Sequence, residues 1–271
     1  CVCAFAIRRL HMQRLRFLSS KPGQADGVGA ISGEKYIYTR ACVLLLGDSI
    51  TQQGAEPNGW AAALTAAYGR DRKADVINRG FSGYNSRHLL RALPILLPQV
   101  GAGDRVAAVT LLIGSNDATR PGSPQHVPVS EYTANVQSIL RAVREAFPNA
   151  ALFVITPPPV DKIKLDAEFK KQGKGDGSGR SLETVEAYVK EARAVARKEG
   201  AALVDLHASM LAQEDWKARF LSDGLHLTGG GNKHLFELLC EVMAKDAPDM
   251  LPGNLSMHLP KHTDANDVFK S

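Results

Sequence analysis

The stretch Cys42–Thr51, which reads CVLLLGDSIT, joins a continuous apolar run to a glycine and two polar side chains. Five apolar residues in succession, from Cys42 to Leu46, are typical of a strand that is covered on both faces of a parallel sheet. Asp48 and Ser49 favour the start of a helix, because both side chains accept bonds from the first helical N–H groups. The stretch therefore predicts a strand, a tight turn and a helix in direct succession.

The same rhythm continues along the chain. The short apolar runs that predict strands are Cys42–Leu46, Asp75–Asn78, Val106–Ile113, Leu152–Ile155 and Ala202–Leu206. The segments with apolar residues at helical spacing are Trp60–Tyr68, Glu131–Phe147, Leu182–Glu199 and Asn232–Ala244. Strands that alternate with helices predict an α/β fold, in which a parallel sheet lies between two layers of helices.

Length and composition set the limits of this domain. The chain has 271 residues, of which 44% are hydrophobic and 23% charged, and these values exclude a disordered chain, a collagen-like fibre and a small disulfide scaffold. No apolar run approaches the ~18 residues that span a bilayer. We expect one domain over residues 36–247 and an extended tail over 248–271. Residues 161–180, rich in Lys and Gly, predict a polar loop that is either a lid or a disordered insertion.

The positive charge is concentrated at the N-terminus. Residues 1–25 hold five Lys and Arg and no acid, which leaves 28 basic and 28 acidic residues in the rest of the chain. A neutral body argues against nucleic acid as a partner. We interpret residues 1–35 as a basic leader. Its first 22 residues fit a transit peptide, or an irregular N-terminus with Met12 as the start. We expect a cytoplasmic protein, or a mitochondrial one if that peptide is a targeting signal.

The four cysteines do not indicate a metal site. None forms a C-x-x-C pair and no histidine stands at zinc-binding spacing beside them. We expect reduced thiols, and neither a metal nor an organic cofactor.

Polar residues follow the predicted strands, and the carboxyl ends of parallel strands are where such folds bind ligands. Ser49 follows the first strand; its hydroxyl could act as a nucleophile if a base takes its proton, and the alternative is a helix N-cap. Gly83 follows the second strand, where a glycine lets the backbone approach a ligand; the alternative is a turn before a helix capped at Ser86. Asn116 follows the third strand, and its amide could donate to an oxyanion or simply occupy a turn.

The segment before the last helix supplies a base. Asp223 and His226 are three residues apart, which places both on one side of a helical turn. A carboxylate in that position can hold the imidazole in one tautomer, so that the other ring nitrogen can deprotonate a serine. The alternative is a structural Asp–His pair.

Together these segments resemble the SGNH hydrolases, also called the GDSL esterase and lipase family, whose four sequence blocks contribute a serine, a glycine, an asparagine and a histidine in that order. The resemblance spans about Leu44 to Leu239. Several details are similar to the isoamyl acetate-hydrolysing esterase branch, namely Gly47–Gln52, Gly59-Trp60, Asn78–Arg87, Asn116–Ala118, Pro157–Pro159 and Asp223–Leu227. Two departures are conservative, because Ile50 replaces a leucine and Ser115 replaces an alanine.

The resemblance implies a three-layer flavodoxin-like fold, with a mostly parallel five-stranded sheet and helices on both faces. It implies a serine esterase that acts on short-chain, acetate-type esters through an acyl-enzyme. Ser49, Asp223 and His226 would be catalytic, and the oxyanion hole would comprise Ser49, Gly83 and Asn116. The alternatives are a sugar O-acetyl ester, a thioester or a lysophospholipid as substrate, or a binding protein without activity. Self-association into a homo-oligomer stays open.

Overall fold

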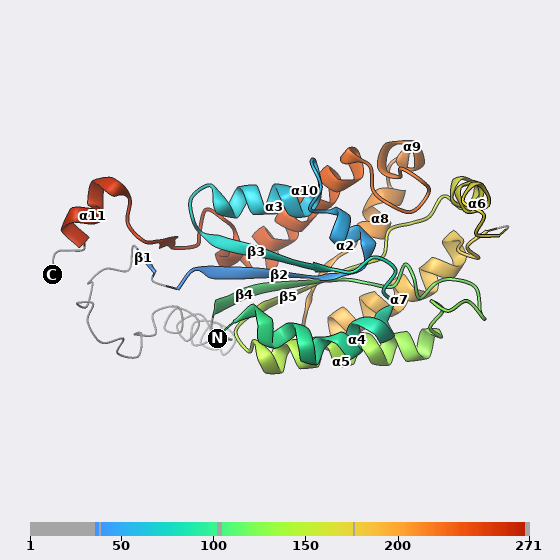
Figure 1. Ribbon diagram of the computed structural model, residues 1–271, viewed down its shortest axis with the longest axis horizontal. Helices are drawn as coiled ribbons and strands as arrows, with labels where there is room; N and C mark the ends of the chain where they lie inside the picture. The colour runs from blue at the N-terminus through green and yellow to red at the C-terminus, as the bar shows by residue number, and fades with distance from the viewer. Residues whose placement is uncertain (1–35, 38, 102–104, 176, 269–271) are drawn as a thin grey trace, which may run out of the picture. The chain divides into compact units, whose positions relative to one another are not determined.

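Five parallel strands form the central sheet, in the order β3-β2-β4-β5-β6 (Figure 1). Along the chain they are β2 (Ala41–Gly47), β3 (Ala74–Gly80), β4 (Val106–Leu112), β5 (Ala151–Ile155) and β6 (Ala202–Val204). All five predicted strands are confirmed, and their ends shift by two residues at most. The last strand ends two residues early because Asp205 caps the helix that follows. The order reverses beside β2, which is the point where sheets of this kind bind ligands.

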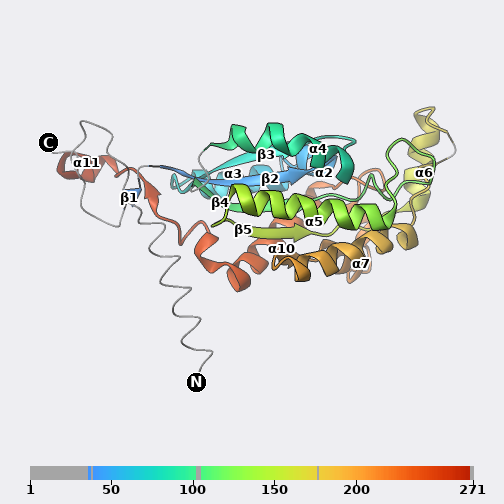
Figure 2. The ribbon, with the colours of Figure 1, turned by 90° about the horizontal axis from the view of Figure 1, so that it is seen from below.

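Helices cover both faces of the sheet, which confirms the three-layer prediction. The layer shown below the sheet in Figure 1 holds α4 (Ser86–Leu96) and α5 (Val129–Ala146), and α7 (Leu182–Lys198) packs beside α5. Figure 2 looks onto this layer. The opposite layer holds α3 (Trp60–Gly69) and α10 (Gly229–Asp246). Successive side chains of β2 alternate between the two cores, so that Leu44 faces the first and Leu45 the second.

Several short helices were not predicted. They are α6 (Lys162–Lys171), α8 (Leu206–Leu211) and α9 (Trp216–Phe220), with 3-10 turns at η1 (Leu97–Val100) and η3 (Pro248–Met250). The short helix predicted directly after β2 is present as α2 (Ser49–Gln53). Helix α6 corrects the prediction of a polar loop over residues 161–180. Asp161 caps this helix by accepting from the N–H of Lys164, and Leu165 is its only buried residue. Because only one residue of α6 is buried, the sequence shows no apolar repeat at helical spacing, and the helix could not be predicted from it.

The structure describes residues 36–37, 39–101, 105–175 and 177–268, so the predicted leader over residues 1–35 lies outside the described part. One compact unit runs from Ala41 to Leu255. The predicted tail begins at residue 248, yet Leu255 is buried in the core and its carbonyl accepts from Lys73 Nζ at 2.7 Å. The first eight residues of that tail therefore belong to the packed unit.

The described residues outside this unit form a separate small assembly. Strand β1 (Tyr36–Ile37) pairs in parallel with β7 (Met257–His258). Helix α11 (His262–Val268) follows, so the tail is not extended throughout.

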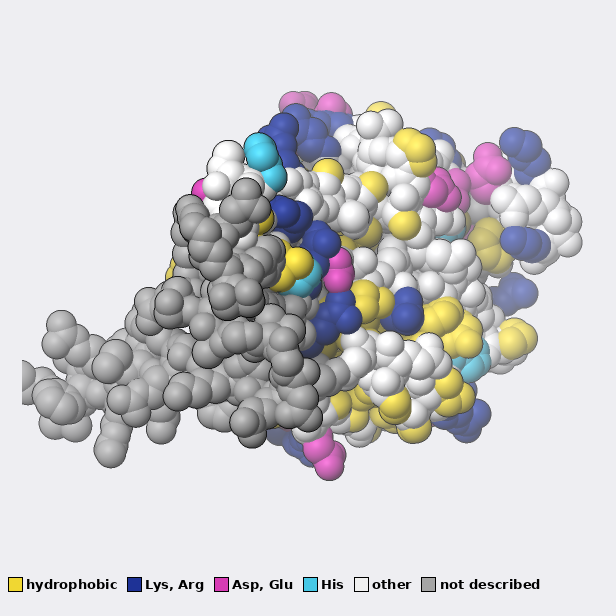
Figure 3. All heavy atoms as spheres, turned by 60° about the vertical axis from the view of Figure 1, so that its left-hand side comes forward, with side chains coloured by type: hydrophobic (Ala, Val, Ile, Leu, Met, Phe, Trp, Pro, Cys, Tyr) yellow, Lys and Arg dark blue, Asp and Glu magenta, His cyan; other side chains and the backbone are white. Residues whose placement is uncertain are grey.

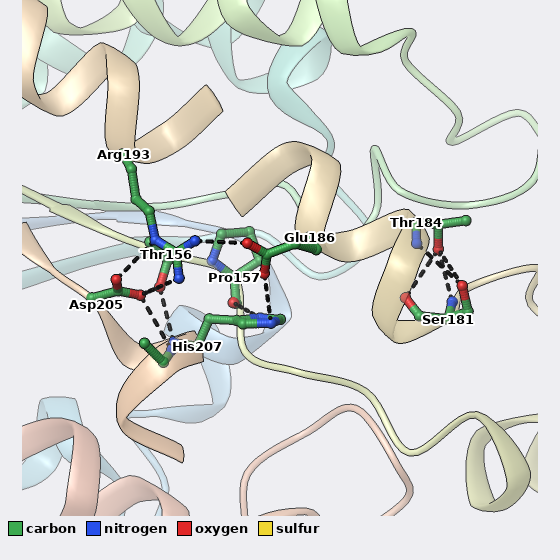
Figure 4. Close-up of polar contacts among 9 residues, drawn as sticks. Thr156, Pro157, Ser181, Thr184, Glu186, Arg193, Asp205 and His207 are labelled. Atoms are coloured by element: carbon green, nitrogen blue, oxygen red, sulfur yellow. Dashed lines mark hydrogen bonds and ion pairs between the residues drawn. The ribbon is translucent and has the colours of Figure 1, made fainter. Parts of the chain in front are cut away.

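A polar cluster braces the carboxyl ends of β5 and β6, with Arg193 of α7 at its centre (Figure 4). Arg193 donates to both carboxylate oxygens of Asp205, at 2.8 and 3.2 Å, and to Glu186 at 2.7 Å. Glu186 also lies 3.0 Å from Nε2 of His207, and Thr156 bonds both Asp205 and the backbone of His207. The cluster joins α7, α8 and the sheet at the edge where the predicted site lies.

One face of the molecule shows how its charged side chains are distributed. On the face drawn in Figure 3, Lys and Arg side chains lie at several separate places among hydrophobic and uncharged ones. Among the helices that the structure describes, none combines the length and the hydropathy needed to cross a membrane.

Candidate active site

Three of the predicted site residues follow three neighbouring strands. Ser49 is the first residue of α2, directly after β2, while Gly83 follows β3 and Asn116 follows β4. Because β3 and β4 flank β2 and all three run in parallel, their carboxyl ends meet at one edge with Ser49 in the middle. The side chain of Asp48 caps α2 by accepting from the N–H of Ile50 at 2.9 Å, as the sequence predicted.

The structure brings Ser49 together with His226, 177 positions further along the chain. Ser49 Oγ lies 2.8 Å from Nε2 of His226, and Nδ1 of the same ring lies 2.6 Å from Oδ2 of Asp223. A carboxylate beside Nδ1 keeps the ring proton on that nitrogen, so Nε2 is left to accept the proton of the serine hydroxyl. This chain of two short contacts is the arrangement that activates a serine as a nucleophile.

Asp223 is held in its ionised form. Its Oδ1 accepts from the backbone N–H groups of Leu225 at 2.9 Å and His226 at 2.8 Å, which leaves Oδ2 for the imidazole. Burial by itself would raise the pKa of Asp223, but the hydrogen bond to the His226 ring, the charge of that ring and the two backbone N–H groups together lower it to about 2. The carboxylate can therefore stabilise an imidazolium across the whole range of neutral and mildly acidic pH.

Three groups that follow the adjacent strands β2, β3 and β4 have hydrogen-bond donors without acceptors in the described part of the chain. Among the residues that the structure describes, no acceptor bonds the backbone N–H of Ser49 or of Gly83. Gly83 has a φ of +81°, a conformation that glycine adopts without the cost that a side chain would bring. Asn116 Nδ2 donates one hydrogen to the carbonyl of Tyr84 at 2.8 Å, and its second hydrogen has no partner in the described part of the chain.

Two further residues reach Asn116 from loops. Its Oδ1 accepts from Arg180 Nη2 at 3.0 Å and from Gln125 Nε2 at 3.2 Å. Arg180 belongs to the segment that was predicted to be a polar loop, and nothing in the sequence indicates that it is buried. Gln125 lies in an irregular stretch of prolines and glycine before α5, where the sequence has no period that would reveal which side chains face inward.

Two buried carboxyl groups lie beside the site. Both oxygens of Asp117 accept from the N–H of Ser86, at 3.0 and 3.1 Å, and so tie the end of β4 to the start of α4. Burial raises the pKa of Asp117 to about 6 and that of Asp48 to about 7. Oδ2 of Asp48 is buried and has no hydrogen-bond partner among the described residues, which fits a carboxyl group that keeps its proton near neutral pH.

We expect Asp48→Asn to stabilise the fold at pH 8. A carboxyl whose folded pKa is about 7 holds its proton more tightly than the unfolded chain, where the ordinary value is 3.8. The contribution of the Asp48 carboxyl group to the free energy of unfolding is therefore fully present below pH 4 and is lost as the pH rises to 7. An uncharged amide avoids this loss. Urea unfolding at pH 5 and pH 8 should show a gain on the order of 2 kcal/mol at pH 8 and a weaker dependence on pH.

The exposed Asp71→Asn serves as the control and should leave the pH dependence unchanged. In Asp48→Asn, the free energy of unfolding should still fall between pH 4 and pH 6, but less steeply. Asp117 causes this remaining dependence, because its pKa is also raised in the folded protein. If Asp48→Asn were less stable than the wild type by the same amount at pH 5 and at pH 8, the assignment of a protonated Asp48 would be contradicted.

A cavity of about 140 Å³ lies next to the residues that follow Ser49 and His226. It is lined by Ile50, Gln53, Glu56, Pro57, Gly59, Leu227, Gly229 and Asn232. Within the described ranges, no group of three or more His, Cys, Asp and Glu side chains is placed to hold a metal ion.

Comparisons with known proteins agree with this geometry. The model of the GDSL-like lipase/acylhydrolase family matches residues 45–234. A GDSL esterase/lipase of Arabidopsis thaliana is 35% identical over 84% of this chain and 96% of its own length. An isoamyl acetate-hydrolyzing esterase 1 homolog of Bos taurus is 38% identical over 82% and 89% of the two chains. The crystal structure of a lipase/acylhydrolase from Enterococcus faecalis, 20% identical, superposes over 81% of this chain and 100% of its own with a TM-score of 0.60.

Proposed function

The chain belongs to the GDSL-like lipase/acylhydrolase family and is a carboxylic ester hydrolase, and on this premise we propose that it cleaves short-chain, acetate-type esters through an acyl-enzyme intermediate. The observation that carries the mechanism is the chain of contacts from Ser49 Oγ to His226 Nε2, at 2.8 Å, and from His226 Nδ1 to Asp223 Oδ2, at 2.6 Å.

In the first half of the reaction, Ser49 Oγ forms a bond to the ester carbonyl carbon while its proton passes to His226 Nε2. Asp223 stabilises the resulting imidazolium and keeps the ring in position. The carbonyl electron pair moves onto oxygen, which makes a tetrahedral oxyanion. When that pair returns, the C–O bond to the alcohol breaks and His226 gives its proton to the departing oxygen.

In the second half, water takes the place of the alcohol. His226 removes a proton from water, the hydroxide adds to the acyl carbon, and the second tetrahedral intermediate releases the carboxylic acid. The proton on His226 then returns to Ser49 Oγ. Neither half needs an electron donor or acceptor.

We assign the oxyanion hole to the backbone N–H groups of Ser49 and Gly83 and to the Asn116 amide. Two features support this assignment: each has a hydrogen without an acceptor in the described part of the chain, and the three residues follow adjacent strands. Donors that are in place before charge develops stabilise the transition state without a cost of reorganisation.

The proposed substrate class rests on relatives of 37–38% identity that are named isoamyl acetate-hydrolyzing esterase 1 homologs. We expect kcat/KM to fall along the series p-nitrophenyl acetate, butyrate and octanoate, and isoamyl acetate to release acetate and isoamyl alcohol. The assay is initial-rate hydrolysis, with product acetate measured for the natural ester.

The outcomes of this assay separate the alternatives. Rates that rise with acyl length would keep the serine chemistry and move the substrate toward lysophospholipids. If acetylated xylo-oligosaccharides or acyl thioesters were turned over with a higher kcat/KM than isoamyl acetate, the substrate would be a sugar ester or a thioester and not a simple alkyl acetate. A lack of turnover on every ester would contradict the proposal.

A further inference from the structure

Arg180 is a buried cation that reaches the candidate site from a distant loop. Its side chain is only 2% exposed, and its guanidinium donates from Nε to the carbonyl of Ser115 at 2.6 Å and from Nη2 to Oδ1 of Asn116 at 3.0 Å. A buried charge is costly unless it is paired or hydrogen-bonded. Neither of these two acceptors is charged, and the electrostatic support for the cation comes from the nearby acids Asp48, Asp223 and Asp117.

The guanidinium determines which way the Asn116 amide faces. Arginine only donates hydrogen bonds, so the atom of the Asn116 amide that faces it must be the oxygen. The NH₂ group of Asn116 is then turned to the opposite side. One of its hydrogens bonds the carbonyl of Tyr84 at 2.8 Å, and the other remains for the substrate.

Gln125 fixes the same amide and also the neighbouring glycine. Its Nε2 donates one hydrogen to Oδ1 of Asn116 at 3.2 Å and the other to the carbonyl of Gly83 at 2.9 Å. The backbone carbonyl of Gln125 is in turn held by Asn85 Nδ2 at 2.9 Å. One side chain therefore joins two of the three groups that we assign to the oxyanion hole.

The loop that carries Arg180 is shaped to deliver it. Gly179 has a φ of +71°, and a Cβ there would lie 2.4 Å from the Cβ of Arg120, so only glycine fits. The buried hydroxyl of Ser178 accepts from the N–H of Arg180 at 3.1 Å, and the N–H of Ser178 bonds Asp166 on α6 at 3.1 Å. The backbone before Arg180 is thus fixed by contacts on both sides.

We propose that Arg180 and Gln125 are positioning residues, which lock the Asn116 amide with its NH₂ group toward the carbonyl oxygen of the substrate. The guanidinium also polarises the Asn116 carbonyl, which strengthens the opposite N–H as a donor, since linked hydrogen bonds reinforce one another. The inference rests on the esterase function proposed above and deepens it. The segment that brings Arg180 to the site therefore contributes to the chemistry of the site.

Arg180 keeps its charge at neutral pH. Burial lowers the pKa of its guanidinium to about 10, and the carboxylates of Asp48, Asp223 and Asp117 act against this decrease. Removing the cation would take a favourable positive charge away from Asp223 and Asp117, so a substitution at Arg180 also affects stability.

The test is a double-mutant cycle that uses Asn116 as the partner. The single variants are Arg180→Met, Gln125→Met and Asn116→Ala, and each of the first two is also combined with Asn116→Ala. We expect Asn116→Ala to lower kcat about 10²- to 10³-fold and Arg180→Met about 10- to 100-fold, both with little change in KM. In the Asn116→Ala background, Arg180→Met should lower kcat by no more than about twofold, because a residue that acts through Asn116 has nothing left to position.

Arg87→Met is the matched control. Arg87 also donates two bonds, to Glu131 at 2.6 and 2.7 Å, and among the described residues it makes no hydrogen bond to Asn116. Its loss should leave kcat unchanged. If Arg180→Met does not fold, Gln125→Met replaces it in the cycle, since Gln125 is only partly buried and holds no charge. Its loss of kcat should be smaller in the Asn116→Ala background than in the wild type, and the part that remains comes from its bond to the carbonyl of Gly83. Equal losses of kcat with and without Asn116 would overturn the inference.

A second measurement is independent of turnover. In ¹⁵N relaxation, the side-chain amide of Asn116 should be as rigid as the backbone in the wild-type protein and should gain mobility in Gln125→Met. An amide that is mobile in the wild type, or equally rigid in both proteins, would reject the positioning role. Absence of ester hydrolysis together with a rigid amide would reject the proposed function alone.

Discussion

Replacing Ser49 by alanine is expected to lower kcat for p-nitrophenyl acetate by roughly 10⁵- to 10⁶-fold. In the proposed mechanism this hydroxyl bonds the acyl carbon, and no other nucleophile lies within hydrogen-bond reach of His226 Nε2 in the described part of the chain. The folded state should be retained, because Ser49 makes no other side-chain hydrogen bond there. Initial rates and thermal unfolding of the same preparation test both expectations.

The molecule supplies its own control for this experiment. Ser209 Oγ lies 2.7 Å from Nε2 of His234, which is a second serine–histidine contact as short as the first. No carboxylate bonds the far nitrogen of that ring within the described residues, and the ring instead stacks on Phe220 with centroids 4.7 Å apart. Ser209→Ala should leave kcat unchanged. A Ser49→Ala protein with the activity of the wild type would refute the assignment of the nucleophile.

The second large effect concerns His226 and Asp223, the pair that is hydrogen-bonded to Ser49 through the imidazole ring. We expect His226→Ala to cost about as much as Ser49→Ala, since without the ring no group accepts the serine proton. Asp223→Asn should cost about 10⁴-fold, because the asparagine NH₂ would donate to Nδ1 and force the ring proton onto Nε2, where it blocks Ser49. The residual activity of Asp223→Asn should therefore exceed that of His226→Ala.

The informative result is which of the two variants, His226→Ala or Asp223→Asn, loses more kcat. His234→Ala, which removes the ring of the other serine–histidine pair, should not change kcat and serves as the matched control. An Asp223→Asn protein with full activity would mean that the tautomer of His226 is set by another group. An Asp223→Asn protein less active than His226→Ala would mean that the carboxylate takes a direct part in the reaction.

The sheet and the residues at its edge could be predicted because their signals are local. Five consecutive apolar residues in β2 and the glycine after them describe a buried strand and a tight turn without reference to the rest of the chain. Parallel strands then place the residues after Ile113 and Gly47 at the same edge. The three-residue spacing of Asp223 and His226 is likewise readable in the sequence itself.

Other features depend on contacts that no local pattern records. Helix α6 buries one residue and is therefore invisible to a search for apolar periods. Arg180 and Gln125 reach Asn116 from positions 64 and 9 residues away, through single side chains in irregular loops. Leu255 packs into the core at a place where Lys73, 182 positions earlier in the chain, donates to its carbonyl. Each of these depends on where the chain returns in space, which composition does not reveal.

The separation of 177 positions between Ser49 and His226 bears on how the protein becomes active during synthesis. The proposed oxyanion donors, from Ser49 to Asn116, leave the ribosome early, and the strands that carry them are neighbours that can associate at once. The base arrives only with the last quarter of the compact unit, after β6 has added the final edge of the sheet. A nascent or truncated chain that ends before His226 would have the proposed oxyanion donors without the proposed proton acceptor, and we expect it to remain inert toward esters until that part of the unit has been translated.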